Sequence, residues 1–210
     1  MKKKIIVLIV TTILIGVFTF LGGLNPFNDN LILKRLFSVS MNLLNGVTAF
    51  IAIKLTDVKI DIELKNFWQY LIGLVIALVL SLGIAFIPAW CGVSLAGAHM
   101  NFDLGTLLYA IFLFFLVIGP VEELIFRVYY QETFISFFNK NKWIGVIIAS
   151  ALFGMWHLIN GSPLQVLFTF GIGLVFGFAK YFIKRFKYLG VSFAHGLYDF
   201  LNIIVTMFVV

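Results

Sequence analysis

The residues of this sequence best suited to chemistry lie inside apolar stretches of the chain. Two adjacent carboxylates, Glu122 and Glu123, are followed four residues later by Arg127, and apolar and aromatic residues surround all three. Histidines occur in two further apolar stretches, at His157 and at His195. Carboxylates and imidazoles are the side chains that most often move protons in catalysis. These residues therefore predict a site for acid–base chemistry.

The spacing of the charges assigns a different role to each carboxylate. Residues four apart share a face of a helix, so Glu123 lies over Arg127, whereas Glu122 is rotated away from that face by roughly 100°. Carboxylates in poorly hydrated sites can exchange protons near neutral pH. Glu122 is therefore the candidate base, with Glu123 and Arg127 as its support. A buried ion pair without a catalytic role is the alternative, although an ionisable group at membrane depth costs about 2.5 to 3.5 kcal/mol and usually serves a function.

Each of the two histidines also has a possible partner four residues away, on the same face of a helix. His195 and Asp199 are four residues apart, so Asp199 can accept a hydrogen bond from His195 and fix its tautomer. Phe153 precedes His157 by one helical turn, where its ring can exclude water or support the imidazole. For either histidine alone, a hydrogen bond that joins two helices is the preferred explanation.

The composition indicates a membrane protein. Of the 210 residues, 62% are hydrophobic and 11% are charged, and the mean hydropathy is +1.09. A soluble globule needs more polar surface than this. The net charge of +6 follows from basic residues in the loops, as the positive-inside rule requires, so we expect the lipid bilayer and not nucleic acid as a partner.

The elements that must position the site are about seven apolar spans, which we expect to form one all-α transmembrane bundle over residues 1–210. The expected spans are 5–24, 31–55, 67–88, 104–138, 143–159, 164–183 and 189–210. Residues 1–103 supply three of them, and residues 104–210 form the catalytic core. The distribution of basic residues places the N-terminus in the cytoplasm.

Several local features of the sequence predict further details of these spans. The span 104–138 is too long for one straight crossing, so we expect a kink at Pro120 or a helix that projects beyond the bilayer. Residues 56–65 alternate charged and apolar residues, as a segment on the membrane surface would. Gly161, Ser162 and Pro163 should separate two spans, and the GxxxG at Gly173 and Gly177 predicts close helix packing.

The hairpin turn near residues 139–142 brings two of the candidate residues to one level. Glu122 precedes this turn by nearly as many residues as His157 follows it, so antiparallel helices place the two at similar depth. His195 lies closer to its own turn. It reaches that depth only if the neighbouring helices project or tilt.

Three motifs together resemble those of a known family. Glu122, Glu123 and Arg127 fit EExxxR, Phe153 and His157 fit FxxxH, and the last motif, HxxxN/D, is matched by His195 and Asp199. In this order, over roughly residues 104–210, the chain is similar to the CAAX proteases and bacteriocin-processing enzymes (the CPBP or Abi family), intramembrane endopeptidases that include the Ras-converting CAAX endopeptidase. The first three spans match only in hydropathy.

The resemblance implies hydrolysis of a peptide bond within the membrane by a metal-independent glutamate mechanism. Glu122, assisted by His157, would activate water, while His195 stabilises the oxyanion and Asp199 orients His195. The sequence departs from the family at Val128, where glycine is frequent, and at Asp199, where asparagine is commoner. An ionised aspartate cannot donate to an oxyanion, so Asp199 must be protonated or act through His195.

Other functions compete with this one. Two histidines and several carboxylates could bind zinc, but no HExxH is present, and we expect no cofactor. A transporter would also carry such residues at membrane depth, although the halves show no internal repeat. A bacteriocin immunity protein or membrane scaffold would use the same fold to bind a partner without cleaving it.

The substrate that fits these features is a membrane-associated protein or peptide. A CAAX-like protein, a leader peptide and a bacteriocin all meet that description. The short chain with three lysines at its start favours a multi-pass protein of the bacterial plasma membrane. The sequence does not specify an oligomeric state.

Overall fold

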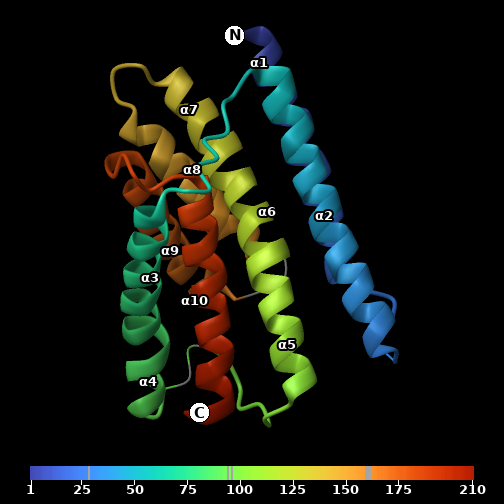
Figure 1. Ribbon diagram of the computed structural model, residues 1–210. Helices are drawn as coiled ribbons and strands as arrows, with labels where there is room; N and C mark the ends of the chain where they lie inside the picture. The colour runs from blue at the N-terminus through green and yellow to red at the C-terminus, as the bar shows by residue number, and fades with distance from the viewer. Residues whose placement is uncertain (28, 94, 96, 159–161) are drawn as a thin grey trace. The chain divides into compact units, whose positions relative to one another are not determined.

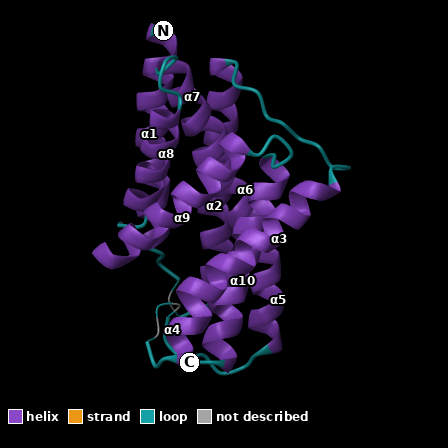
Figure 2. Ribbon diagram, turned by 90° about the vertical axis from the view of Figure 1, so that its left-hand side faces the viewer, coloured by secondary structure: helices purple, strands orange, loops and turns teal. Residues whose placement is uncertain are grey.

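The computed structural model describes residues 1–27, 29–93, 95, 97–158 and 162–210. The described residues form helices joined by loops, with no strand among them (Figures 1 and 2). The predicted all-α fold is confirmed.

Within the described residues, six helices are long and apolar enough to cross a membrane, which makes this a multi-pass membrane protein. They are Lys2–Gly23, Leu31–Thr56, Phe67–Trp90, Leu104–Phe137, Pro163–Phe182 and Tyr188–Phe208. The seventh predicted span corresponds to the shorter helix Trp143–Trp156, and its predicted end at residue 159 lies outside the described residues. The cytoplasmic placement of the N-terminus stays a prediction.

Local sequence explains where the helices begin and end. Helix α2 (Leu31–Thr56) starts after Asn30, whose side chain accepts a hydrogen bond from the Leu33 amide at 3.0 Å. Helix α9 (Pro163–Phe182) starts with Ser162 as its cap. We had expected Pro163 to lie between two spans. It is instead the first residue of α9, a position at which the amide hydrogen that proline lacks would have no partner within the helix. Gly161, the third residue of the predicted break, lies outside the described residues.

The segment between α2 and α3 (Phe67–Ser81) has no regular secondary structure at residues 58–63. Asp57 ends α2 in the left-handed conformation, with φ of 57°. The predicted surface segment is therefore an extended connection, and its location at the membrane surface stays a prediction.

The long span 104–137 is built from five helical elements. They are α5 (Leu104–Leu113), η2 (Phe114–Ile118), α6 (Gly119–Glu123), η3 (Leu124–Tyr130) and α7 (Gln131–Phe137). The elements η2 and η3 are π-helical. Proline removes one amide from the regular helical ladder, and Pro120 lies between them. Two π-helical stretches, of a kind often found at functional sites, thus flank the element that contains Pro120. The kink or projection expected for this span stays a prediction.

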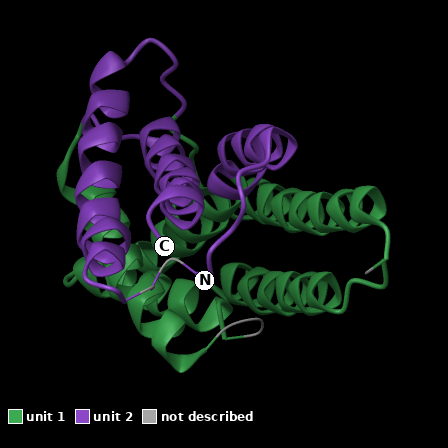
Figure 3. Ribbon diagram, turned by 90° about the horizontal axis from the view of Figure 1, so that it is seen from below, with its two compact units in different colours: residues 1–61, 121–184 green, residues 62–120, 185–210 purple. Residues whose placement is uncertain are grey.

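The chain forms two compact units that interleave in sequence (Figure 3). The first unit comprises residues 1–61 and 121–184, and the second comprises residues 62–120 and 185–210. The boundary at residue 120 falls inside α6. The predicted division into residues 1–103 and 104–210 stays a prediction.

Each unit has its own helix contacts. In the first unit, α1 (Lys2–Gly23) packs against α2, α8 (Trp143–Trp156) packs against α9, and η3 contacts both α2 and α8. In the second unit, α10 (Tyr188–Phe208) packs against α3, α5 and η2.

Glycines let α8 and α9 approach closely, as the GxxxG predicted. A Cβ on Gly177 would lie 2.8 Å from Cγ1 of Val146, and a Cβ on Gly173 would lie 3.0 Å from the ring of Phe153. A Cβ on Gly154 would lie 2.8 Å from the backbone oxygen of Val166. These helices are therefore held at a separation that an added methyl group would not allow.

We expect Gly154→Ala to lower the free energy of unfolding by about 1 to 3 kcal/mol, because overpacking a close helix contact forces backbone to move. Gly171→Ala is the matched control, since no atom lies within 4 Å of a Cβ at that position of α9. Thermal unfolding of both variants in the same detergent measures the difference. Equal melting temperatures for the two variants would contradict this account of the contact.

Candidate active site

The centre of the candidate site in the first unit is a buried ion pair. Nε of Arg127 lies 3.3 Å from Oε2 of Glu123, and both side chains are fully buried. The guanidinium carbon of Arg127 also lies 4.9 Å from the centroid of the Phe153 ring. A charge on an aromatic face is stabilised by the ring quadrupole, and more strongly where water is excluded. The predicted pairing of Arg127 with Glu123 is confirmed.

Glu122 is half-buried and also lies within electrostatic reach of this arginine. The charges of both Glu123 and Glu122 act on the guanidinium of Arg127. From the sequence we had treated residues 122–127 as a regular α-helix, in which Arg127 pairs with Glu123 and not with Glu122. Arg127 belongs instead to η3, whose wider i→i+5 turn changes the angles between successive side chains.

His157 lies directly after the last residue of α8, and its imidazole is held by Phe153. Nδ1 of His157 is 2.9 Å from the backbone oxygen of Phe153, and the two rings meet edge to face with centroids 5.0 Å apart. A carbonyl oxygen can only accept, so Nδ1 carries the proton and Nε2 of the neutral ring is an acceptor. Phe153 therefore contacts both Arg127 and His157.

Aromatic rings join η3 to α8 around this contact. The Phe126 ring, which is fully buried, lies 5.1 Å from the Phe153 ring and 5.8 Å from the Trp156 ring, between centroids. Edge-to-face aromatic contacts of this kind add to the apolar area that they bury. The EExxxR and FxxxH motifs are thus brought together in the first unit.

The third motif lies in the second unit. Nε2 of His195 is 3.4 Å from Oδ2 of Asp199, and His195 is 4% exposed whereas Asp199 is partly exposed. The predicted contact between the two side chains is present. The combination of His195 and Asp199 with Glu122 and His157 in one site stays a prediction.

Glycines fix the part of α10 that carries His195. A Cβ on Gly196 would lie 2.6 Å from the backbone oxygen of Phe114, and a Cβ on Gly119 would lie 2.6 Å from the backbone oxygen of Ser192. The Tyr188 hydroxyl donates to the backbone oxygen of Pro120 at 2.9 Å. Helix α10 is therefore locked against the backbone of residues 114–120.

The sequence reasoning missed several polar residues that hold η3 and α7. The Tyr130 hydroxyl donates to Thr12 Oγ1 at 3.0 Å. Nε2 of Gln131 donates to the backbone oxygen of Gly177 at 3.3 Å. Two adjacent threonines in an otherwise apolar first span were the available signal, because hydroxyl groups at membrane depth need partners.

Among the residues that the structure describes, no three side chains of histidine, cysteine, aspartate or glutamate gather as a metal-ligand group. The candidate site residues instead form two pairs, Glu123 with Arg127 and His195 with Asp199.

Residues 103–201 match the family model described as type II CAAX prenyl endopeptidase Rce1-like. We therefore refer to residues 103–201 as the Rce1-like domain. The resemblance read from the three motifs is thereby confirmed, and the Rce1-like family is a family of proteases. The match contains every residue that we had singled out: Glu122, Glu123, Arg127, Phe153, His157, His195 and Asp199. Neither the curated proteins nor the solved structures yielded a match.

We expect Arg127→Ala to lower the free energy of unfolding of the Rce1-like domain by about 3 to 5 kcal/mol, because it leaves the buried carboxylate of Glu123 without its cation. Glu122→Gln should cost much less, since Glu122 is half-buried and the exchange keeps its volume. Expression level and melting temperature in detergent compare the two variants. Equal melting temperatures for the two variants would show that the pair of Glu123 with Arg127 does not stabilise the fold by this amount.

Proposed function

We propose that this protein is an intramembrane endopeptidase of the glutamate type, which hydrolyses a peptide bond of a membrane-associated protein or peptide. The observation that carries this proposal is the match of residues 103–201 to a protease family. It is supported by the contacts that bring the carboxylate and histidine motifs of the first unit together through Phe153.

The residues have the properties that peptide hydrolysis requires. The reaction needs a base for the attacking water, donors for the oxyanion and an acid for the leaving amine. Glu122, assisted by Nε2 of His157, takes a proton from water as the water oxygen attacks the carbonyl carbon of the peptide bond. That proton then passes to the amine nitrogen as the C–N bond breaks.

One set of residues stabilises the oxyanion, and another set holds the base in place. In this proposal His195 stabilises the oxyanion, and Asp199 acts through His195, because an ionised carboxylate has no hydrogen to donate. Glu123, Arg127 and Phe153 hold the base and the imidazole in place. The substrate is a CAAX-like protein, a leader peptide or a bacteriocin, cleaved at the bacterial plasma membrane.

We expect Glu122→Gln to reduce cleavage by at least about 10²-fold, because an amide cannot accept the proton from water. Glu132→Gln is the matched control, since it removes a carboxylate of the same unit that pairs with Lys180 at 2.6 Å. Peptides released from membranes that contain each variant, compared by mass spectrometry, measure the cleavage. A cellular effect that survives Glu122→Gln would show that the protein acts by binding, as an immunity protein or a scaffold does.

We also propose that the reaction needs no metal. Cleavage by the purified protein should therefore be unchanged by a strong zinc chelator, and the protein should hold far less than one zinc per chain. Elemental analysis of the same sample gives the metal content. Loss of cleavage in chelator, with recovery on adding zinc, would instead assign the histidines and carboxylates to a metal.

A further inference from the structure

A pocket of the second unit lies where two candidate membrane spans begin. It has a volume of about 770 Å³ and is lined by residues 63–68, which lead into α3, and by Arg185, from the loop before α10. Helix α3 starts at Phe67, and α10 starts at Tyr188. Because the helices starting there are long and apolar enough to cross a bilayer, we expect the pocket to lie at the level of the membrane surface.

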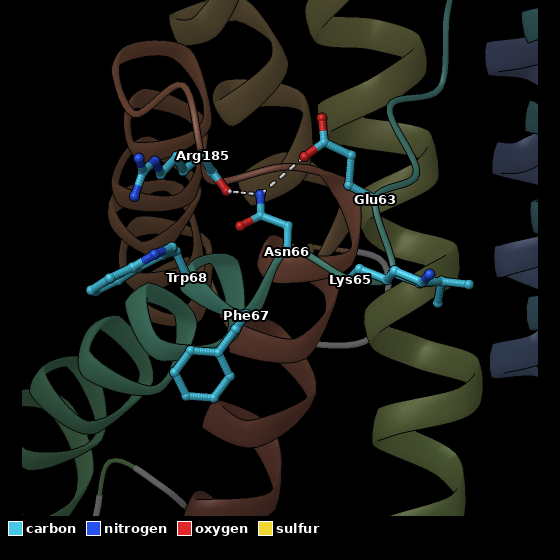
Figure 4. Close-up of a pocket in the computed structure, with 7 residues that line it drawn as sticks. Glu63, Lys65, Asn66, Phe67, Trp68 and Arg185 are labelled. Carbon is cyan, nitrogen blue, oxygen red and sulfur yellow. Dashed lines mark hydrogen bonds between the residues drawn. The ribbon is translucent and has the colours of Figure 1, made fainter.

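Asn66 joins the two walls of this pocket (Figure 4). Its Nδ2 donates to the backbone oxygen of Arg185 at 2.9 Å and to Oε2 of Glu63 at 3.1 Å. One amide thus connects segments that lie 119 residues apart in the chain. The pocket is therefore formed before any ligand enters it.

The pocket combines a cation with exposed aromatic rings. The guanidinium carbon of Arg185 lies 5.7 Å from the centroid of the Trp68 ring, and Trp68 and Phe67 are 51% and 69% exposed. In Figure 4 the Glu63 carboxylate lies on the opposite side of Asn66 from the Arg185 guanidinium. The side with Arg185 therefore presents positive charge next to apolar surface.

We infer that this side of the pocket binds the headgroup of an anionic phospholipid. The planar guanidinium of Arg185 matches the geometry of a phosphate, and exposed aromatic rings at the end of a span favour the interface between headgroups and acyl chains. A free phosphate would use the arginine but leave both rings in water. The bound lipid ties the start of α3 to the loop before α10, the helix that carries His195.

Thermal unfolding of the full-length protein in detergent tests the inference without any activity assay. Added phosphatidylglycerol should raise the melting temperature of the wild type, whereas phosphatidylcholine with the same chains should raise it much less. Arg185→Gln should weaken the apparent affinity for phosphatidylglycerol about five-fold, as loss of one basic residue at an anionic surface does. Trp68→Leu should weaken it too.

Lys54→Gln is the matched control. It removes a cation that lies 5.3 Å from the centroid of the Phe50 ring, but that belongs to the first unit and does not line the pocket. This variant should bind phosphatidylglycerol as the wild type does.

Three results would overturn the inference. They are equal stabilisation by phosphatidylcholine, equal stabilisation by glycerol 3-phosphate, and an unchanged affinity in Arg185→Gln. If Arg185→Gln does not fold, Arg185→Lys replaces it, because it keeps the charge but not the planar fork. Wild-type affinity in both Arg185→Lys and Trp68→Leu would then overturn the inference as well.

Discussion

The first unit depends on the burial of one charged side chain. Arg127 is fully buried, and removing a guanidinium from water costs several kcal/mol unless charges and rings replace the solvent. The structure supplies the Glu123 carboxylate on its own helix and the Phe153 ring from α8. Gly173 of α9 leaves room for the Phe153 ring, since a Cβ there would lie 3.0 Å from that ring. The close packing of α9 on α8 is therefore part of the same constraint.

This constraint also explains why the FxxxH motif contains a phenylalanine. The Phe153 ring contacts Arg127, the Phe153 backbone oxygen binds Nδ1 of His157, and the Phe126 ring lies against it. One residue thus connects the arginine of the first motif with the histidine of the second. A smaller side chain would keep the backbone hydrogen bond but lose the ring contacts with Arg127, Phe126 and His157.

The sequence was sufficient for the all-α fold, the span positions to within a few residues and the contacts that depend on i, i+4 spacing. The pair Glu123 with Arg127 and the pair His195 with Asp199 belong to that group, because helical spacing alone places them. The π-helical stretches could not be read from the sequence, since apolar runs support α- and π-helix alike. The contacts of Phe153 with Arg127 and of Gly196 with Phe114 depend on how separate helices pack, which residue spacing within one helix does not determine.

Residues outside the Rce1-like domain also stabilise its first motif. The domain begins at residue 103, yet Thr12 of α1 accepts a hydrogen bond from the Tyr130 hydroxyl of η3. π-helical stretches are rare and are often found at functional sites. The hydrogen bond from α1 holds η3 three residues after Arg127. The first helix therefore has a role that its hydropathy alone does not indicate, because it fixes a residue of the π-helical stretch that carries the buried charge.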